Sequence, residues 1–114
     1  MAVAFQDIGE RLRRICLSGR LDLAATEAVA NELAALCASP QRRVVLDMSA
    51  VSFISSIGIR ALVVNAKVQH ALGGKLVVQA AAGGSVARIL ETTGVDLIVP
   101  VFFDAAAAEA AVLG

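Results

Sequence analysis

The sequence predicts an α/β fold, with one domain over residues 1–114 and a mixed, mostly parallel β-sheet of about four to five strands on which helices pack. A chain of 114 residues suits one domain with a single modest core. Segments with strand character alternate with segments of helical periodicity, and this alternation implies crossover connections between parallel strands. The unbroken run Val44–Val45–Leu46 is typical of a strand buried on both faces, as in a parallel sheet.

The first third of the chain is predicted to form a β-hairpin and then a helix. Residues 2–22 have the pattern of two short strands joined at 7–10, where the letters DIGE include a glycine suited to a hairpin turn. Residues 23–39 are predicted to be helical because apolar residues recur at spacings of four, four and three. These residues are Ala25, Val29, Leu33 and Leu36. Ser39 and Pro40 are expected to end the helix.

A strand, a long helix and a second strand are predicted next. The strand covers residues 42–49, and the helix covers residues 56–72. The predicted helix has a polar face, which consists of Arg60, Lys67 and Gln69. Its apolar face consists of Ile59, Leu62, Val63 and Ala66. The letters GGK at 73–75 end the helix, because glycine tolerates a left-handed cap, and residues 75–80 form the next strand.

The C-terminal part is predicted to contain a short helix, an edge strand and a closing helix. Residues 81–94 have the pattern of a loop and a short helix that stops at Gly94. Residues 95–102 are predicted to be a short strand, and Pro100 within it indicates an edge of the sheet. Residues 104–113 are predicted to be a helix with Asp104 as its N-cap.

Charge and composition argue against several classes of protein. Ten basic and ten acidic residues give a formal net charge of zero, whereas proteins that bind nucleic acid directly usually carry a basic excess. No stretch reaches the roughly 18–20 apolar residues of a spanning helix, so membrane insertion is not expected. No secretory signal is recognisable at the N-terminus. Cys16 and Cys37 lack metal-ligand spacing and are expected to be reduced thiols of a cytoplasmic protein.

The residues do not form a recognisable catalytic motif. The single histidine, His70, would lie roughly 20 Å from Ser56 along one helix, too far to take its proton. The letters ISSIG at 54–58 lack the spacing of a nucleophile elbow. Neither glycine pair, at 73–74 or 83–84, is followed by the Lys-Ser/Thr of a phosphate-binding loop. An anion at the second pair is an alternative to an ordinary turn. We therefore expect no enzymatic activity, no cofactor and no metal.

Ser55 and Ser56 lie where a strand gives way to a helix, and two interpretations are open. Either serine can cap the helix by accepting a hydrogen bond from a backbone N–H of its first turn. The second interpretation is a modification site, because one cap needs only one serine and Gly58 costs helix stability at this position. A phosphate would be tolerated at a helix N-terminus, but it would repel a partner docked on the neighbouring isoleucines.

Three blocks of the sequence resemble a bacterial STAS domain of the anti-sigma-factor antagonist (anti-anti-sigma factor) type. They are SGRLDLAAT at 18–26, VVLDMSAVSFISSIGIRAL at 44–62 and ILETTGVDLIVPVF at 89–102. The resemblance implies a cytoplasmic bacterial regulator of transcription without catalysis. It implies binding to an anti-sigma factor with serine-kinase activity, inactivation by serine phosphorylation, and restoration by a PP2C-type phosphatase, a cycle known as partner switching.

The resemblance also assigns residues to the site. The phosphorylated position falls on Ser56, with Ser55 as the second choice. Asp47 and Asp22 are implied to support the site, Asp47 by hydrogen bonds to the junction loop. The implied partner-binding residues are Ser55, Ser56, Ile57, Gly58, Ile59 and Arg60.

Two other functions stay open at this point. A STAS module can belong to another assembly, such as a stressosome-like scaffold, a non-transcriptional partner switch or a lipid-transporter subunit. A scaffold would form large particles on a sizing column. The remaining alternative is a small-molecule or nucleotide binder, or an enzyme, and a binder would show a ligand-dependent rise in melting temperature.

Overall fold

A computed structural model describes residues 2–114, which form a five-stranded sheet with four α-helices. The strands are β1 (Ala2–Ile8), β2 (Leu12–Leu21), β3 (Arg43–Ile54), β4 (Leu76–Gln79) and β5 (Val101–Phe102). The helices are α1 (Leu23–Cys37), α2 (Ser56–Ala71), α3 (Ser85–Thr92) and α4 (Ala105–Leu113), with a 3₁₀ turn, η1, at Val95–Leu97. The sheet order is β1-β2-β3-β4-β5; only the β1–β2 pair is antiparallel. The predicted mixed, mostly parallel sheet is therefore confirmed.

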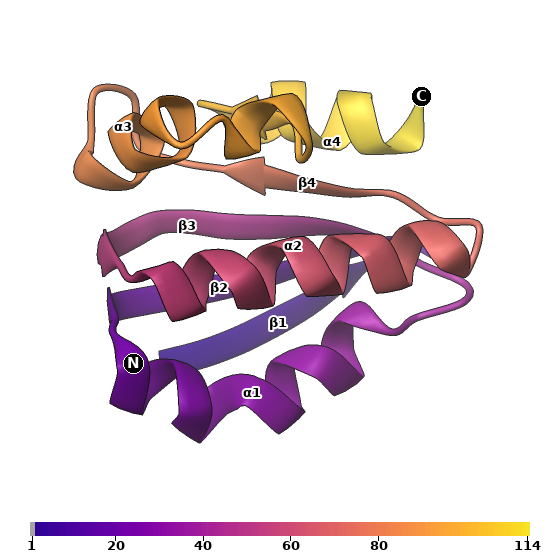
Figure 1. Cartoon of the computed structure of the whole chain (residues 1–114). Coiled ribbons are helices and arrows are strands. Elements are labelled where there is room, and N and C mark those ends of the chain that lie inside the picture. Colours follow the sequence, from indigo (N-terminus) through magenta and orange to yellow (C-terminus); the bar gives the residue numbers. More distant parts are fainter. Residues whose placement is uncertain (1) are drawn as a thin grey trace.

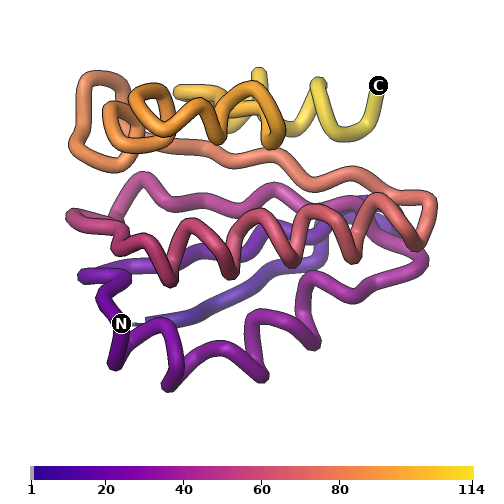
Figure 2. Tube along the Cα trace, viewed as in Figure 1, coloured from indigo at the N-terminus to yellow at the C-terminus, as the bar shows by residue number. Residues whose placement is uncertain are grey.

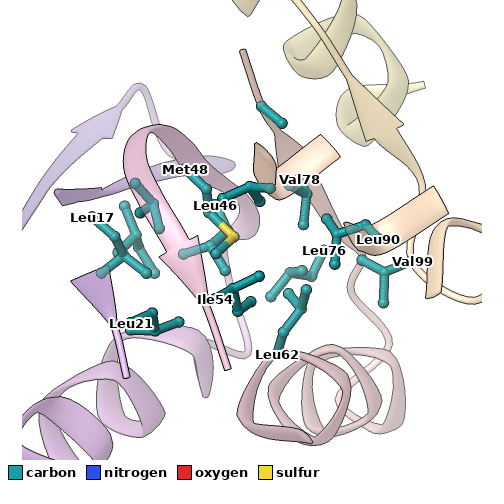
Figure 3. Packing of buried hydrophobic residues seen from close by; sticks show 14 of the residues in the cluster. Leu17, Leu21, Leu46, Met48, Ile54, Leu62, Leu76, Val78, Leu90 and Val99 are labelled. Carbon is teal, nitrogen blue, oxygen red and sulfur yellow. The ribbon is translucent and has the colours of Figure 1, made fainter. Parts of the chain in front are cut away.

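Helices cover both faces of the sheet. Figure 1 shows α1 and α2 side by side along one face, and the larger core lies between that face and helices α1, α2 and α3. Figure 3 shows Leu46 and Val78 of the sheet pointing into this core towards Leu62 and Leu90. On the opposite face, Val45 belongs to a smaller cluster, which also contains Leu12, Val77, Ala108 and Val112. The prediction that β3 is buried on both faces is confirmed, because Val44, Val45 and Leu46 are at most 1% exposed.

The predicted edge strand over residues 95–102 is wrong in most of its length. Only Val101–Phe102 pairs with β4, and Val95–Leu97 is a 3₁₀ turn that starts after Gly94 at φ 77°. The run of apolar residues resembles a strand in the sequence, although its side chains differ in burial. Val95 and Val99 are buried, while Leu97 is 89% exposed. The turn satisfies backbone groups locally, with the N–H of Leu97 donating to the carbonyl of Gly94.

Strand β3 is longer than the predicted 42–49, because it continues to Ile54. Despite two register shifts, one before Ser18 and one after Gly19, residues Gly19–Leu21 of β2 still pair with residues of Val51–Ile54 in β3. These irregularities let the two parallel strands stay paired up to the point where α1 and α2 begin. The junctions β2–α1 and β3–α2 therefore lie next to each other.

Gln69 was expected on the polar face of α2, and this is wrong. Its side chain is 0% exposed, and Nε2 donates to the carbonyls of Cys37 and Ser39 at 2.6 and 3.1 Å. These carbonyls at the end of α1 have no helical N–H to bind, so the amide replaces the missing donor. Gly74 makes room for this side chain, since a Cβ there would lie 1.6 Å from Gln69 Oε1.

Candidate functional site

The candidate site lies at the carboxyl ends of the parallel strands. Figure 2 shows the chain turning from β2 into α1, from β3 into α2 and from β4 towards α3 at the same end of the sheet. Ligands and partners of open α/β sheets approach at this end. The β3–α2 junction holds both candidate serines, so they share this end with the β2–α1 junction.

Ser55 is the N-cap of α2, and both capacities of its hydroxyl are used. Its Oγ accepts from the backbone N–H of Gly58 at 3.2 Å and donates to the carbonyl of Leu21 at 2.9 Å. The backbone N–H of Ser55 donates to the same carbonyl at 3.0 Å. Ser55 thus fastens the start of α2 to the end of β2, 34 residues earlier in the chain.

Replacing Ser55 should therefore destabilise the fold more than replacing Ser56. We expect Ser55→Ala to lower the free energy of unfolding by about 1–2 kcal/mol, because it removes the cap and the hydrogen bond from the hydroxyl to the Leu21 carbonyl, which keeps only the backbone N–H of residue 55 as a donor. Ser56→Ala is the matched control, and it should change stability by less than about 0.5 kcal/mol. Urea unfolding followed by circular dichroism measures both. Equal losses for the two variants would show that Ser55 is not the cap in solution.

Ser56 is the first residue of α2 and is exposed. Its hydroxyl has no hydrogen-bond partner among residues 2–114, in contrast to that of Ser55. A helix N-terminus offers free N–H groups and the positive end of the helix dipole. The Ser56 side chain is thus reachable from solvent at a position where added negative charge suits the helix.

Gly58 faces the inside of the protein. It is buried, and a Cβ there would meet Ile54 Cγ1 at 2.9 Å, Leu21 Cδ2 at 3.0 Å and the Leu21 carbonyl oxygen at 3.1 Å. Ile59 is half-buried and packs against the larger core. Among the expected partner-binding residues, the structure leaves Ser56 and Arg60 exposed and Ile57 half-buried.

The two aspartates expected to support the site have different surroundings. Asp22 is the N-cap of α1, and its Oδ1 accepts from the backbone N–H of Ala25 at 2.9 Å. Asp22 directly follows Leu21, so this cap helps to fix the position of the Leu21 carbonyl, which accepts the hydrogen bond of Ser55. Asp47 lies within β3, and its carboxylate binds Ser49 and Arg14. Within residues 2–114 it makes no hydrogen bond to residues 52–60, because β3 extends seven residues past it.

Two sets of contacts were not anticipated from the sequence. Ser85 Oγ donates to the carbonyl of Ser52 at 2.7 Å, which ties the start of α3 to the end of β3. Arg14 binds Asp47, Gln79 and Glu109 at 2.6–3.1 Å, and so joins β2, β3, β4 and α4. The available signal for Arg14 was a basic residue within a predicted strand that is otherwise rich in apolar residues.

The cysteine and histidine side chains considered as possible reactive groups make no hydrogen bond to Ser55 or Ser56 within residues 2–114. Cys37 is buried, and burial raises the pKa of its thiol to about 12, so the thiol stays protonated. His70 is exposed in the last turn of α2. No three side chains of His, Cys, Asp or Glu are grouped to hold a metal ion within residues 2–114. No helix in this part of the chain is long and apolar enough to cross a membrane.

Comparisons with known proteins agree with this architecture. The model of the STAS domain family matches residues 9–108. A Bordetella bronchiseptica protein named "Putative anti-sigma factor antagonist BtrV" is 36% identical over 96 residues, which are 84% of this chain and 82% of that protein.

Two solved structures share the fold. An anti-sigma factor antagonist from Mycobacterium paratuberculosis aligns with a TM-score of 0.83 at 24% identity, over 99% of this chain and 94% of that one. The phosphorylated form of the Bacillus cell fate determinant SpoIIAA aligns with a TM-score of 0.68 at 15% identity, over 96% of this chain and 99% of that one. The match of the family model over most of the chain, together with the BtrV relative, shows that this protein belongs to the STAS domain family.

Proposed function

We propose that this protein is an anti-sigma-factor antagonist that is switched off by phosphorylation of Ser56. In the unphosphorylated state it binds an anti-sigma factor with serine-kinase activity in the cytoplasm, which frees a sigma factor. The kinase then phosphorylates the antagonist and releases it, and a PP2C-type phosphatase restores it. The relative BtrV, 36% identical, carries the same description of an antagonist in its name.

The different surroundings of the two serines carry this proposal. The Ser55 hydroxyl accepts the capping hydrogen bond and donates to the Leu21 carbonyl. The neighbouring Ser56 is exposed. A kinase can reach the Ser56 hydroxyl without breaking a hydrogen bond of the fold. Transfer to Ser56 forms a bond from Oγ to the γ-phosphorus of ATP, releases ADP, and gives the hydroxyl proton to a base of the kinase.

The intact mass of the protein after incubation with ATP and the host's purified candidate anti-sigma kinase tests the proposal. We expect one added phosphate in the wild type and none in Ser56→Ala. Ser55→Asn is the matched control, since asparagine keeps a capping oxygen but offers no hydroxyl, and it should accept the phosphate like the wild type. Phosphate retained in Ser56→Ala would assign another acceptor. No phosphate with any candidate kinase would contradict the proposed switch.

A further inference from the structure

A groove between α1 and α2 opens beside Ser56. It has a volume of about 410 Å³, and its lining includes Leu21 and Ile57, the residue that follows Ser56. Figure 1 shows the two helices that form its walls running alongside each other. The lining is mostly apolar, and Val64 in it is 51% exposed. The apolar lining includes Ala30, Leu33, Ala34, Ile57, Ala61 and Val64.

The two rims of the groove carry charges of opposite sign. Glu27 lines it from α1 and Arg60 lines it from α2. Helix α1, which contains Glu27, has acidic residues but no Lys or Arg. Helix α2, which contains Arg60, has basic residues but no Asp or Glu. Neither residue takes part in an ion pair within residues 2–114. Both charges are therefore available to a molecule that fills the groove.

The small side chains on the walls favour a helix as the occupant. Ala30 and Ala34 are one turn apart on α1, and Ala61 of α2 lines the same groove. Alanines at this spacing let a third helix approach at the 8–10 Å between axes that is usual for packed helices. An apolar helix face would cover the lining, and its flanks would meet Arg60 on one side and Glu27 on the other.

We propose that this groove receives an amphipathic helix of the anti-sigma factor, with a carboxylate on the flank that meets Arg60 and a basic residue on the flank that meets Glu27. This inference rests on the proposed function and adds the surface and chemistry of the contact. Ser56 and Arg60 are four residues apart on α2, so they are neighbours on its surface. A phosphate on Ser56 therefore competes with the partner's carboxylate for Arg60, besides adding charge at the mouth of the groove.

Filling the groove tests the docking. The double variant Ala30→Gln/Ala34→Gln places long side chains in the groove and keeps good helix formers on α1. The matched control, Ala28→Gln/Ala35→Gln, makes the same changes at exposed residues of α1 that do not line the groove. Calorimetry with the purified anti-sigma kinase should show binding at least about tenfold weaker for the groove variant. The control should bind within about twofold of the wild type.

Arg60→Gln tests the charge on the rim. It should weaken binding and flatten the dependence of affinity on salt, because an exposed charge contact is screened by ions. Arg11→Gln, at the hairpin end of the sheet, is the control and should change neither. Binding of the groove-filled variant at wild-type affinity would overturn this inference and leave the proposed function standing. A wild-type chain that binds no candidate anti-sigma kinase would overturn both.

Discussion

Phosphorylation of Ser56 is expected to weaken binding of the anti-sigma partner about 100-fold, a penalty of ~3 kcal/mol, while the fold stays intact. The phosphate adds about −1.5 to −2 charges to an apolar contact that would otherwise exclude water. The fold tolerates it because Ser56 is exposed and begins α2, where free N–H groups and the helix dipole favour an anion. The dissociation constants of the phosphorylated and unphosphorylated protein for the partner measure the loss of binding. Their melting temperatures show whether the fold stays intact.

Ser56→Asp should reproduce part of the loss, since one carboxylate carries less charge than a phosphate. Ser56→Ala should bind like the unphosphorylated wild type and resist inactivation by kinase and ATP. The matched control is Ala105→Asp, which adds the same charge to the exposed first residue of α4, on the opposite face of the sheet. If the phosphorylated protein and the unphosphorylated protein bind the partner equally well, Ser56 does not control the interaction.

Helix periodicity and capping patterns correctly predicted the features that depend on residues close together in the sequence. The periodicity of Val29 and Leu33 located α1, and both are buried. Asp104 was predicted as the cap of α4, and its Oδ1 accepts from the backbone N–H of Ala107 at 2.7 Å. Gly73, expected after α2, has φ 81°, as a left-handed cap requires. Caps and short-range periodicity involve neighbours within a few residues, so one segment of sequence contains all that they need.

The features that the sequence did not predict depend on partners far along the chain. Gln69 looked like a surface residue, and its buried position depends on two carbonyls about 30 residues earlier. The roles of Ser55 and Ser56 also depend on a residue far away in the sequence. Either serine could cap a helix, and the carbonyl of Leu21, brought alongside by the pairing of β2 with β3, is what engages Ser55. The sequence therefore located the junction but left the roles of its two serines open.

Gly58 gives the strongest link between the fold and the candidate site, and Gly58→Val is expected to lower the free energy of unfolding by about 3 kcal/mol. A Cβ at this position already meets Ile54 at 2.9 Å and the backbone oxygen of Leu21 at 3.1 Å. The same Leu21 oxygen accepts the hydrogen bonds of Ser55. A valine would therefore push the first turn of α2 away from β2 and stretch the bonds that hold Ser55.

Thermal unfolding should show this loss as a fall in melting temperature of roughly 10–15 °C for a domain of this size. Ala71→Val is the matched control, because it adds two methyl groups and β-branching to an exposed position of the same helix. Gly58→Ala should lie between the two, since alanine's better helix propensity, up to ~1 kcal/mol, offsets part of the clash. Equal melting temperatures for Gly58→Val and Ala71→Val would mean that α2 can shift without cost. In that case the absence of a side chain at Gly58 would have to serve a partner, and the internal contact with Leu21 would not explain it.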